Sequence, residues 1–186
     1  MQLVRPLRMH LASYVAALER DWSADNVRGE AAAREELDCI RSDPAAFIAS
    51  LDDPQGKGPP ITLPDGSRVP RLPGYQRWMW DGEFAGSIGF RWQYGTVELP
   101  SYCLGHIGYA VVPWKQRRGY ATAALRDLLQ EAARTGLPYV ELITDPDNIA
   151  SQRVIEAAGG TLYQRFTKPP QYGGQIGLRY RIVLPR

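Results

Sequence analysis

Cysteine is scarce in this sequence: Cys39 and Cys103 are the only two among 186 residues. Two cysteines are too few for a disulfide framework, and neither lies in a CxxC or paired Cys/His pattern that would hold zinc. We therefore expect two reduced thiols and no metal site. Long apolar runs are missing too, because the stretch from Leu11 to Leu18 is far shorter than the ~20 residues of a membrane span and precedes no cleavage site. These absences favour a cytoplasmic protein without a membrane partner.

A strong charge imbalance is also missing. The 22 Lys and Arg residues against 20 Asp and Glu give a net charge of +2, far from the basic excess of proteins that bind nucleic-acid phosphates. We expect no nucleic-acid partner. With 44% hydrophobic and 23% charged residues, the composition is typical of a folded globular protein. The length fits one domain better than two, so a single domain over residues 1–186 is predicted.

The first third of the chain is predicted to be largely helical. Apolar residues recur at helical spacing over 9–22, 29–41 and 44–51, with Ser42 and Asp43 available as helix caps.

Two segments around this helical part are not helical. We expect an edge strand within residues 2–7, because a proline in a strand is tolerated only at an edge or an end. Residues 54–74 contain six prolines and four glycines, which predicts a loop apart from a small hairpin at Asp65 and Gly66. A loop of this length is either a functional lid or a disordered insert.

An antiparallel hairpin is predicted over residues 75–92, turning at Asp81 and Gly82. Alternation places Trp78 and Trp80 on one face of its first strand and gives the second strand an apolar face of its own, made by Ile88, Phe90 and Trp92.

A strand, a helix and another strand follow the hairpin. The apolar strand 105–112 is stopped by Pro113, and a buried strand is predicted at 139–144. Between them, apolar residues form one broad helical stripe at Ala121, Ala124, Leu125, Leu128, Leu129 and Ala132. Such a unit places the turn at 116–121 at the carboxyl end of a strand, where ligands bind.

The last part of the chain adds a helix and two strands. Asp147 or Asn148 can cap the helix 149–160, and strands are predicted at 161–166 and 177–184. The final strand alternates cleanly, with Arg179 and Arg181 on one face and, on the other, Leu178, Tyr180, Ile182 and Leu184.

The turn "QRRGYA" at 116–121 is a candidate anion site. The first turn of a helix has backbone N–H groups without intrahelical partners, and the helix dipole adds partial positive charge there. The patterns GxxxxGK[ST] and GxGxxG are both absent, so nucleoside triphosphates and dinucleotides lack their signatures. A different carrier of a pyrophosphate group is needed.

The segment "VVPWKQRRGYATAAL" resembles the acetyl-coenzyme A loop of the GNAT N-acetyltransferase superfamily, whose pattern Q/RxxGxG/A follows a strand that ends near proline. Gln116, Gly119 and Ala121 match that pattern. "DPDNIASQRVIEAAGG" is similar to the family's second motif, in which an asparagine, here Asn148, contacts the pantetheine arm of the cofactor. The resemblance extends over residues 75–186 and points to a branch of uncharacterised bacterial acetyltransferases.

The resemblance implies a mixed α/β fold with a central, mostly antiparallel sheet that is flanked by helices and splayed at the strand before residue 116. Acetyl-CoA would insert there as co-substrate, with the backbone of Val111 and Val112 facing its pantetheine and acetyl group. Lys115, Arg117 and Arg118 either add charge near the phosphates or are merely solvated. The pyrophosphate would rest on backbone N–H groups of Arg117, Arg118, Gly119, Tyr120, Ala121 and Thr122.

Acetyl transfer to an amine requires a proton acceptor, because an alkyl ammonium group has a pKa near ~10. Glu141 is the first candidate; it shares a strand face with Tyr139 and Ile143 that points into the cleft or to solvent. His106 is the second, since imidazole titrates near neutrality, although it can equally be a buried structural residue.

The proton donor for the departing thiolate is open. Many members of the family use a tyrosine seven positions after the motif asparagine, and this sequence has Ile155 there. The remaining options are Ser151, Tyr109, Tyr163 and solvent, and a thiolate can also leave unprotonated. The oxyanion would be stabilised by the backbone N–H of Val112 or a neighbour.

The predicted activity is therefore transfer of an acetyl group from acetyl-CoA to a primary amine of a small molecule or a protein. The alternatives are an acyl-CoA-binding regulatory domain without turnover and an unrelated phosphate-binding α/β enzyme. The acceptor amine and the oligomeric state, a homodimer included, are not encoded in any residue pattern.

Overall fold

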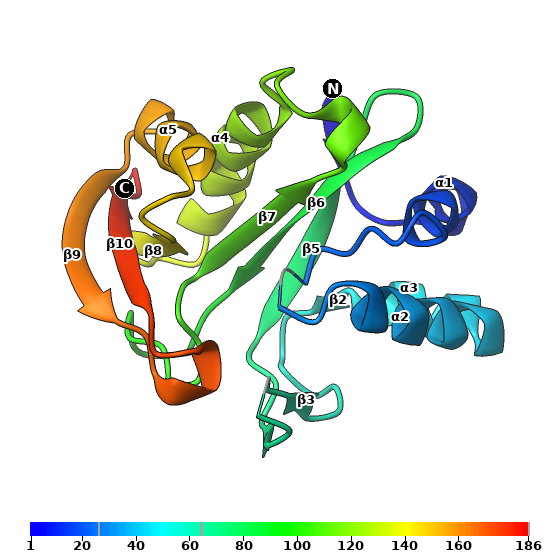
Figure 1. Ribbon diagram of the computed structural model, residues 1–186, viewed down its shortest axis with the longest axis horizontal. Helices are drawn as coiled ribbons and strands as arrows, with labels where there is room; N and C mark the ends of the chain where they lie inside the picture. The colour runs from blue at the N-terminus through cyan, green and yellow to red at the C-terminus, as the bar shows by residue number, and fades with distance from the viewer. Residues whose placement is uncertain (26, 64, 186) are drawn as a thin grey trace.

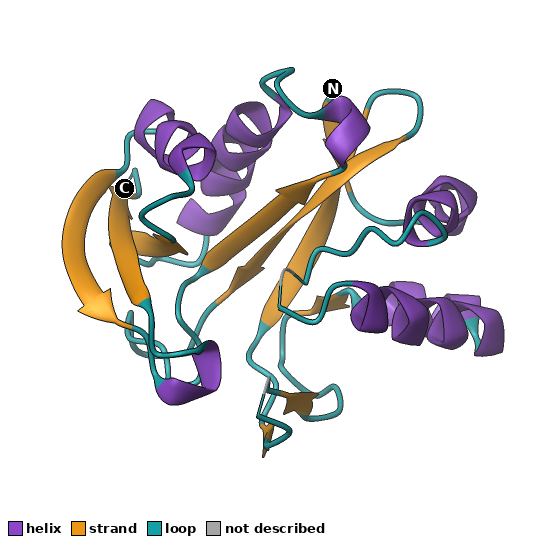
Figure 2. Ribbon diagram, in the orientation of Figure 1, coloured by secondary structure: helices purple, strands orange, loops and turns teal. Residues whose placement is uncertain are grey.

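The computed structural model describes residues 1–25, 27–63 and 65–185. Two main antiparallel sheets flanked by helices, with a small two-stranded sheet beside them, form a mixed α+β fold (Figures 1 and 2). The N-terminal elements are β1 (Gln2–Val4), η1 (Arg8–His10), α1 (Leu11–Leu18), α2 (Glu30–Ser42), α3 (Pro44–Ser50), β2 (Asp52–Asp53), β3 (Ile61–Thr62) and β4 (Arg68–Val69). They are followed by β5 (Gly74–Trp80), β6 (Phe84–Arg91), β7 (Ile107–Val111), η2 (Pro113–Lys115), α4 (Tyr120–Ala133), β8 (Tyr139–Thr144), α5 (Ile149–Ala157), β9 (Thr161–Thr167), η3 (Pro170–Tyr172) and β10 (Ile176–Val183).

The larger sheet has the order β1-β5-β6-β7, and β2 adds a short pairing to β5. All of these pairings are antiparallel. The hairpin predicted from 75–92 is β5 and β6, and the strand predicted near the N-terminus is β1 at the sheet edge, so both predictions are confirmed.

The smaller sheet has the order β8-β10-β9 and is also antiparallel. It joins the larger sheet at one point, where the His106 backbone N–H donates to the Glu141 carbonyl at 2.7 Å. Beyond this point β7 and β8 share no ladder of hydrogen bonds, and Figure 1 shows β7 running away from the smaller sheet. The predicted splay of the central sheet is confirmed.

The two faces of the larger sheet pack against different helices. Met79, Ile88 and Phe90 point to the face covered by α4, whereas Trp78 points to the face covered by α1, α2 and α3. Alternation along the strands predicts this separation, because successive side chains leave a strand on opposite sides. The stripe of α4 is buried as expected, apart from Ala121, which is partly exposed.

The helical N-terminal third is also confirmed, with Asp43 as the cap of α3. The Asp43 carboxylate accepts from the N–H groups of Ala45 at 3.0 Å and Ala46 at 2.9 Å, and Pro44 occupies the first turn, where it costs no hydrogen bond. No helix in the described ranges is both long and apolar enough to cross a membrane.

The segment 54–74 contains the predicted hairpin, because β3 and β4 pair antiparallel around the turn at Asp65 and Gly66. Its base is fixed by Asp53, whose carboxylate accepts from the N–H groups of Lys57 and Gly58. A role of this segment as a lid stays a prediction.

Candidate functional site

The turn between β7 and α4 has two residues in the left-handed region. Arg117 has φ 60° and Gly119, the N-cap of α4, has φ 77°. A side chain at Gly119 would meet nothing within 4 Å, so glycine is needed there for its backbone conformation and not for space. The residues from Gln116 to Gly119 are exposed.

This turn offers a run of free donors. Within the described part of the chain, no hydrogen bond uses the backbone N–H of any residue from 117 to 122, whereas the Ala123 N–H already donates to the Gly119 carbonyl at 3.1 Å. The helix behind these donors has 14 residues, long enough for its dipole to favour an anion at this end.

Lys115 does not belong to this exposed turn, which corrects the expectation that its charge lies near the phosphates or in solvent. Its side chain is 5% exposed and its ammonium contacts Asp81 Oδ1 at 2.5 Å and Glu83 Oε1 at 3.1 Å. Burial by itself would lower the pKa of Lys115, but its hydrogen bonds to Asp81 and Glu83 outweigh burial and raise that pKa. Lys115 therefore anchors the turn to the β5–β6 hairpin.

Asp81 also holds the other end of the turn. The Tyr120 hydroxyl donates to Asp81 Oδ2 at 2.8 Å. Burial would raise the pKa of Asp81, yet the hydrogen bonds from Lys115 and Tyr120 hold it below its usual range. We call Asp81, Lys115 and Tyr120 the Asp81 latch. Asp81 was not predicted from sequence as part of the site, because its place in the turn of the 75–92 hairpin already explains an aspartate there.

The end of β7 is already hydrogen-bonded. The Val112 N–H donates to the Ala85 carbonyl at 3.0 Å, and the Gln116 side chain donates to the Val111 carbonyl at 3.3 Å. The Val112 N–H is thus not free to stabilise an oxyanion, which leaves the other expected donor, a neighbouring backbone N–H, as a prediction.

Helix α5 begins beside β7. Its cap is Asn148, whose side-chain oxygen accepts from the Ser151 N–H at 3.0 Å. The Tyr109 hydroxyl, on β7, donates to the Ser151 carbonyl at 3.2 Å and so bridges β7 and α5 where the sheets diverge. Burial raises the pKa of Tyr109 to about 12, which keeps this hydroxyl protonated at neutral pH. Ile155, at the family's tyrosine position, is 1% exposed and packs in the core with α4.

His106 is fully enclosed at the junction of the two sheets, with 1% exposure. Its Nδ1 accepts from the Glu141 N–H at 3.0 Å, and its Nε2 lies 3.1 Å from the Val97 carbonyl, so Nε2 carries the proton. Burial, with a smaller contribution from the Arg91 guanidinium, lowers the pKa of His106. Both ring nitrogens are occupied by the protein in this arrangement.

The Glu141 carboxylate is held by two arginines of β10. Arg181 Nη2 lies 2.7 Å from Oε1 and Arg179 Nε lies 3.5 Å from Oε2. The Arg181 guanidinium is stacked between the rings of Tyr139 and Tyr163, at 3.8 and 3.7 Å. Glu141 lies on the sheet face opposite Leu142, which is in the core.

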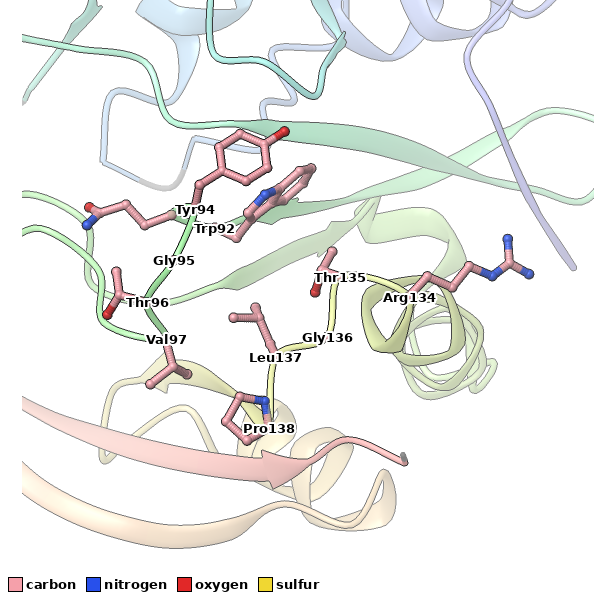
Figure 3. A pocket seen from close by; sticks show the side chains of 11 residues that line it. Trp92, Tyr94, Gly95, Thr96, Val97, Arg134, Thr135, Gly136, Leu137 and Pro138 are labelled. Atoms are coloured by element: carbon pink, nitrogen blue, oxygen red, sulfur yellow. The ribbon is translucent and has the colours of Figure 1, made fainter.

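A separate cavity of about 510 Å³ lies at the C-terminal end of α4 (Figure 3). It is formed by the turn after β6 and the turn after α4, with Trp92, Tyr94 and Leu137 in its wall. None of the predicted site residues lines the cavity, although the Val97 carbonyl, from a residue of its wall, lies 3.1 Å from His106 Nε2. No group of three potential metal ligands occurs within the described ranges.

Comparison with known proteins gives a consistent picture. The profile of the acetyltransferase (GNAT) domain matches residues 67–161, just over half of the chain. The structure resembles the microcin C7 self-immunity acetyltransferase MccE, solved with acetyl-CoA and AMP, with a TM-score of 0.62, 17% identity and coverage of 98% of this chain and 91% of the other. It also resembles RimL, a ribosomal L7/L12 alpha-N-protein acetyltransferase solved with coenzyme A, with a TM-score of 0.58, 15% identity and coverage of 98% and 93%. No curated protein sequence matches.

A sheet that opens beside a helix N-terminus, in a chain matched by this profile, defines an acetyltransferase. The chain belongs to the GNAT acetyltransferase family.

Proposed function

We propose that this protein transfers an acetyl group from acetyl-CoA to a primary amine of a small molecule or a protein, by direct attack within a ternary complex. The observation that carries the proposal is the run of free backbone donors at residues 117–122, at the start of α4, in a chain of the GNAT family. Such a run matches the oxygens of a pyrophosphate group better than any neutral ligand.

In this proposal the whole chain acts as one domain, and the cofactor lies along the opening between β7 and α5. The pyrophosphate is bound by the donors from Arg117 to Thr122. The left-handed conformation of Gly119 sets the direction of these donors, and its lack of a side chain leaves room for the ligand itself. The pantetheine arm would pass Asn148, the cap of α5, and the thioester would reach the end of β7 at Val111. Gln116 supports the turn through its bond to the Val111 carbonyl.

Of the three candidate catalytic residues, Glu141 fits proton removal best. Both nitrogens of His106 are occupied, which favours a structural role for it, and the recorded contacts of Ser151 are made by its backbone. Glu141 is held in one orientation by Arg179 and Arg181 and accepts the ammonium proton directly or through water.

Tyr109 is the best donor to the departing thiolate, because its hydroxyl is placed between β7 and α5 and stays protonated at neutral pH. Its O–H, which donates to the Ser151 carbonyl, would have to turn from that carbonyl to the thiolate. It would substitute for the tyrosine that Ile155 replaces. In this proposal the Tyr109 hydroxyl, on β7, supplies the proton that many members of the family take from a tyrosine in the helix that corresponds to α5.

The test combines isothermal titration of acetyl-CoA with a thiol-release assay over a panel of amines. Binding together with amine-dependent release of coenzyme A supports the proposal. Binding without release of coenzyme A in the presence of any amine favours the alternative, an acyl-CoA-binding regulatory domain, which would not need the tyrosine that Ile155 replaces. Failure of coenzyme A to raise the melting temperature, where a nucleotide does, indicates an unrelated phosphate-binding enzyme.

A further inference from the structure

Two glycines face each other in the middle of the larger sheet. Gly89 of β6 pairs with Gly108 of β7, and Gln76 of β5 continues the same row. The neighbouring row is Trp78, Ser87 and Ala110, on the face that α1, α2 and α3 cover. The glycine row lies on that face too, but Gly108 is exposed, so the helices do not cover this part of the sheet.

The Arg91 side chain lies over these glycines. Its Nη2 is 3.3 Å from the position that a Cβ atom would take on Gly108 and 3.8 Å from the corresponding position on Gly89. No other heavy atom comes within 4 Å of that position on Gly108. Apart from this guanidinium, the space above Gly108 is therefore open.

Arg91 differs from the other partly buried arginines in having no partner. Arg77 is paired with Glu131, and both Arg179 and Arg181 with Glu141. Among the described residues, no carboxylate lies within 4 Å of Arg91 and its guanidinium makes no hydrogen bond. Its donors are therefore available to a ligand, and a guanidinium binds carboxylate or phosphate oxygens in pairs.

The position of Arg91 relates it to the proposed reaction. Gly108 lies three residues before Val111 on β7, a separation of about 10 Å in a strand. Tyr109 points to the opposite face of β7, toward α5. The proposed cofactor and the Arg91 guanidinium therefore lie on opposite faces of β7. An amine that reaches the thioester from the Arg91 side would place the rest of its atoms against this guanidinium.

We propose that Arg91 binds the anionic group of the acceptor, so that the acceptor is a small amine carrying a carboxylate or phosphate a few bonds from the nitrogen. The glycines at 89 and 108 provide the space for that group. This inference rests on the proposed acetyltransferase function and adds the chemical class of its second substrate.

The experiment measures kcat/KM by thiol release for matched amines with and without an anion. The pairs are β-alanine against propylamine and 2-aminoethyl phosphate against ethanolamine; the pair with the larger ratio identifies the anion. Wild type favours the acidic amine, and Arg91→Gln lowers the acidic-to-neutral ratio about 10- to 100-fold, as expected for loss of a charged hydrogen bond. Arg91→Lys recovers part of it, because charge remains but the paired geometry does not. The charge control is Arg165→Gln, an exposed arginine on β9.

Two glycine variants test the position of the guanidinium without changing its charge. Gly108→Ala puts a methyl group 3.3 Å from Arg91 Nη2 and displaces it, so the ratio falls; Gly89→Ala makes contacts no closer than 3.7 Å and keeps the ratio. Equal rates on acidic and neutral amines in wild type, or equal losses on both in Arg91→Gln, overturn the proposal.

If no amine releases thiol, the proposed function fails separately. Calorimetric titration of β-alanine and 2-aminoethyl phosphate into protein saturated with coenzyme A then decides the Arg91 proposal. Binding that Arg91→Gln weakens at least tenfold supports an anion site, and equal or absent binding in both proteins overturns it.

Discussion

The Asp81 latch predicts that a residue outside the cofactor turn controls both stability and cofactor affinity. The perturbation is Asp81→Asn, which keeps the shape of the side chain and removes its charge. Lys115 is 5% exposed and Asp81 15% exposed, so the substitution leaves a buried ammonium without its main counterion.

The size of the effect follows from this burial. Removing one partner of a buried ion pair costs about 3–5 kcal/mol, but Glu83 stays 3.1 Å from the ammonium, although 68% exposed and screened by solvent. The asparagine oxygen also still accepts a hydrogen bond. We expect a loss of about 2–3 kcal/mol in the free energy of unfolding, measured by urea denaturation.

Cofactor affinity should fall as well. The latch fixes the residue before the turn and the first residue of α4, so its loss frees the turn between them. Ordering the backbone of one residue costs about 1–2 kcal/mol, and binding must then supply that free energy. Calorimetry should show an acetyl-CoA Kd about tenfold higher. The matched control is Glu83→Gln, which touches the same ammonium from the surface and should change the free energy of unfolding by less than about 1 kcal/mol. If Asp81→Asn behaves like Glu83→Gln in both measurements, the latch does not position the turn.

Three further predictions concern single residues of the site. Gly119→Val forces a β-branched residue to φ 77° and should weaken acetyl-CoA binding at least tenfold. The control Gly136→Val, with the same φ at the far end of α4, should lower stability alone. Equal acetyl-CoA affinities in the two variants would contradict the assignment of the turn as the pyrophosphate site. Tyr109→Phe should lower kcat about 10- to 100-fold with little change in the KM for acetyl-CoA, while Tyr163→Phe on β9 should not; since the pKa of Tyr109 is raised to about 12, wild-type kcat should show no decline from this group up to pH 10. His106→Gln should flatten the pH dependence of stability. Because burial lowers the pKa of His106, the unfolded chain binds a proton below about pH 6.5 more readily than the folded chain does. Wild-type stability therefore falls as the pH drops below that value, by at most about 1.4 kcal/mol per pH unit. Parallel curves for wild type and His106→Gln between pH 5 and 7 would refute this assignment.

Elements with a clear period could be predicted from sequence. The alternation in β10 indicates which side chains are buried, because a two-residue period has only one register that places Leu178, Tyr180 and Ile182 in the core. The stripe of α4 is equally specific. Pro113, before the turn at 116–121, and Gly119, within it, fix where the strand ends and the helix begins. The place of that turn in the fold follows from these signals alone.

Contacts between distant segments could not be predicted in this way. Lys115 stands among basic residues in a turn, and this local sequence predicts a solvated side chain; its partner Asp81 is 34 residues earlier. Likewise, nothing near Arg91 shows that Gly108 lies beside its guanidinium, because that depends on the register between β6 and β7. Lys115, which was predicted wrongly, and Arg91, which was not predicted at all, are both charged side chains whose environment is set by another strand.

Lys115 and Arg91 suit two separate tasks in the proposed function, cofactor binding and recognition of the acceptor. Lys115 is neutralised by Asp81 and Glu83, so its charge holds the turn in place and does not attract phosphate. The donors of residues 117–122 are backbone groups, and their positions do not depend on side-chain rotamers. Arg91 on the other face of the sheet keeps its charge unpaired among the described residues. A site made of backbone groups suits a cofactor whose pyrophosphate is always the same, and a single side-chain guanidinium suits the group that distinguishes one amine from another. Substitutions at the turn should therefore change the affinity for acetyl-CoA, and substitutions at Arg91 the choice of acceptor.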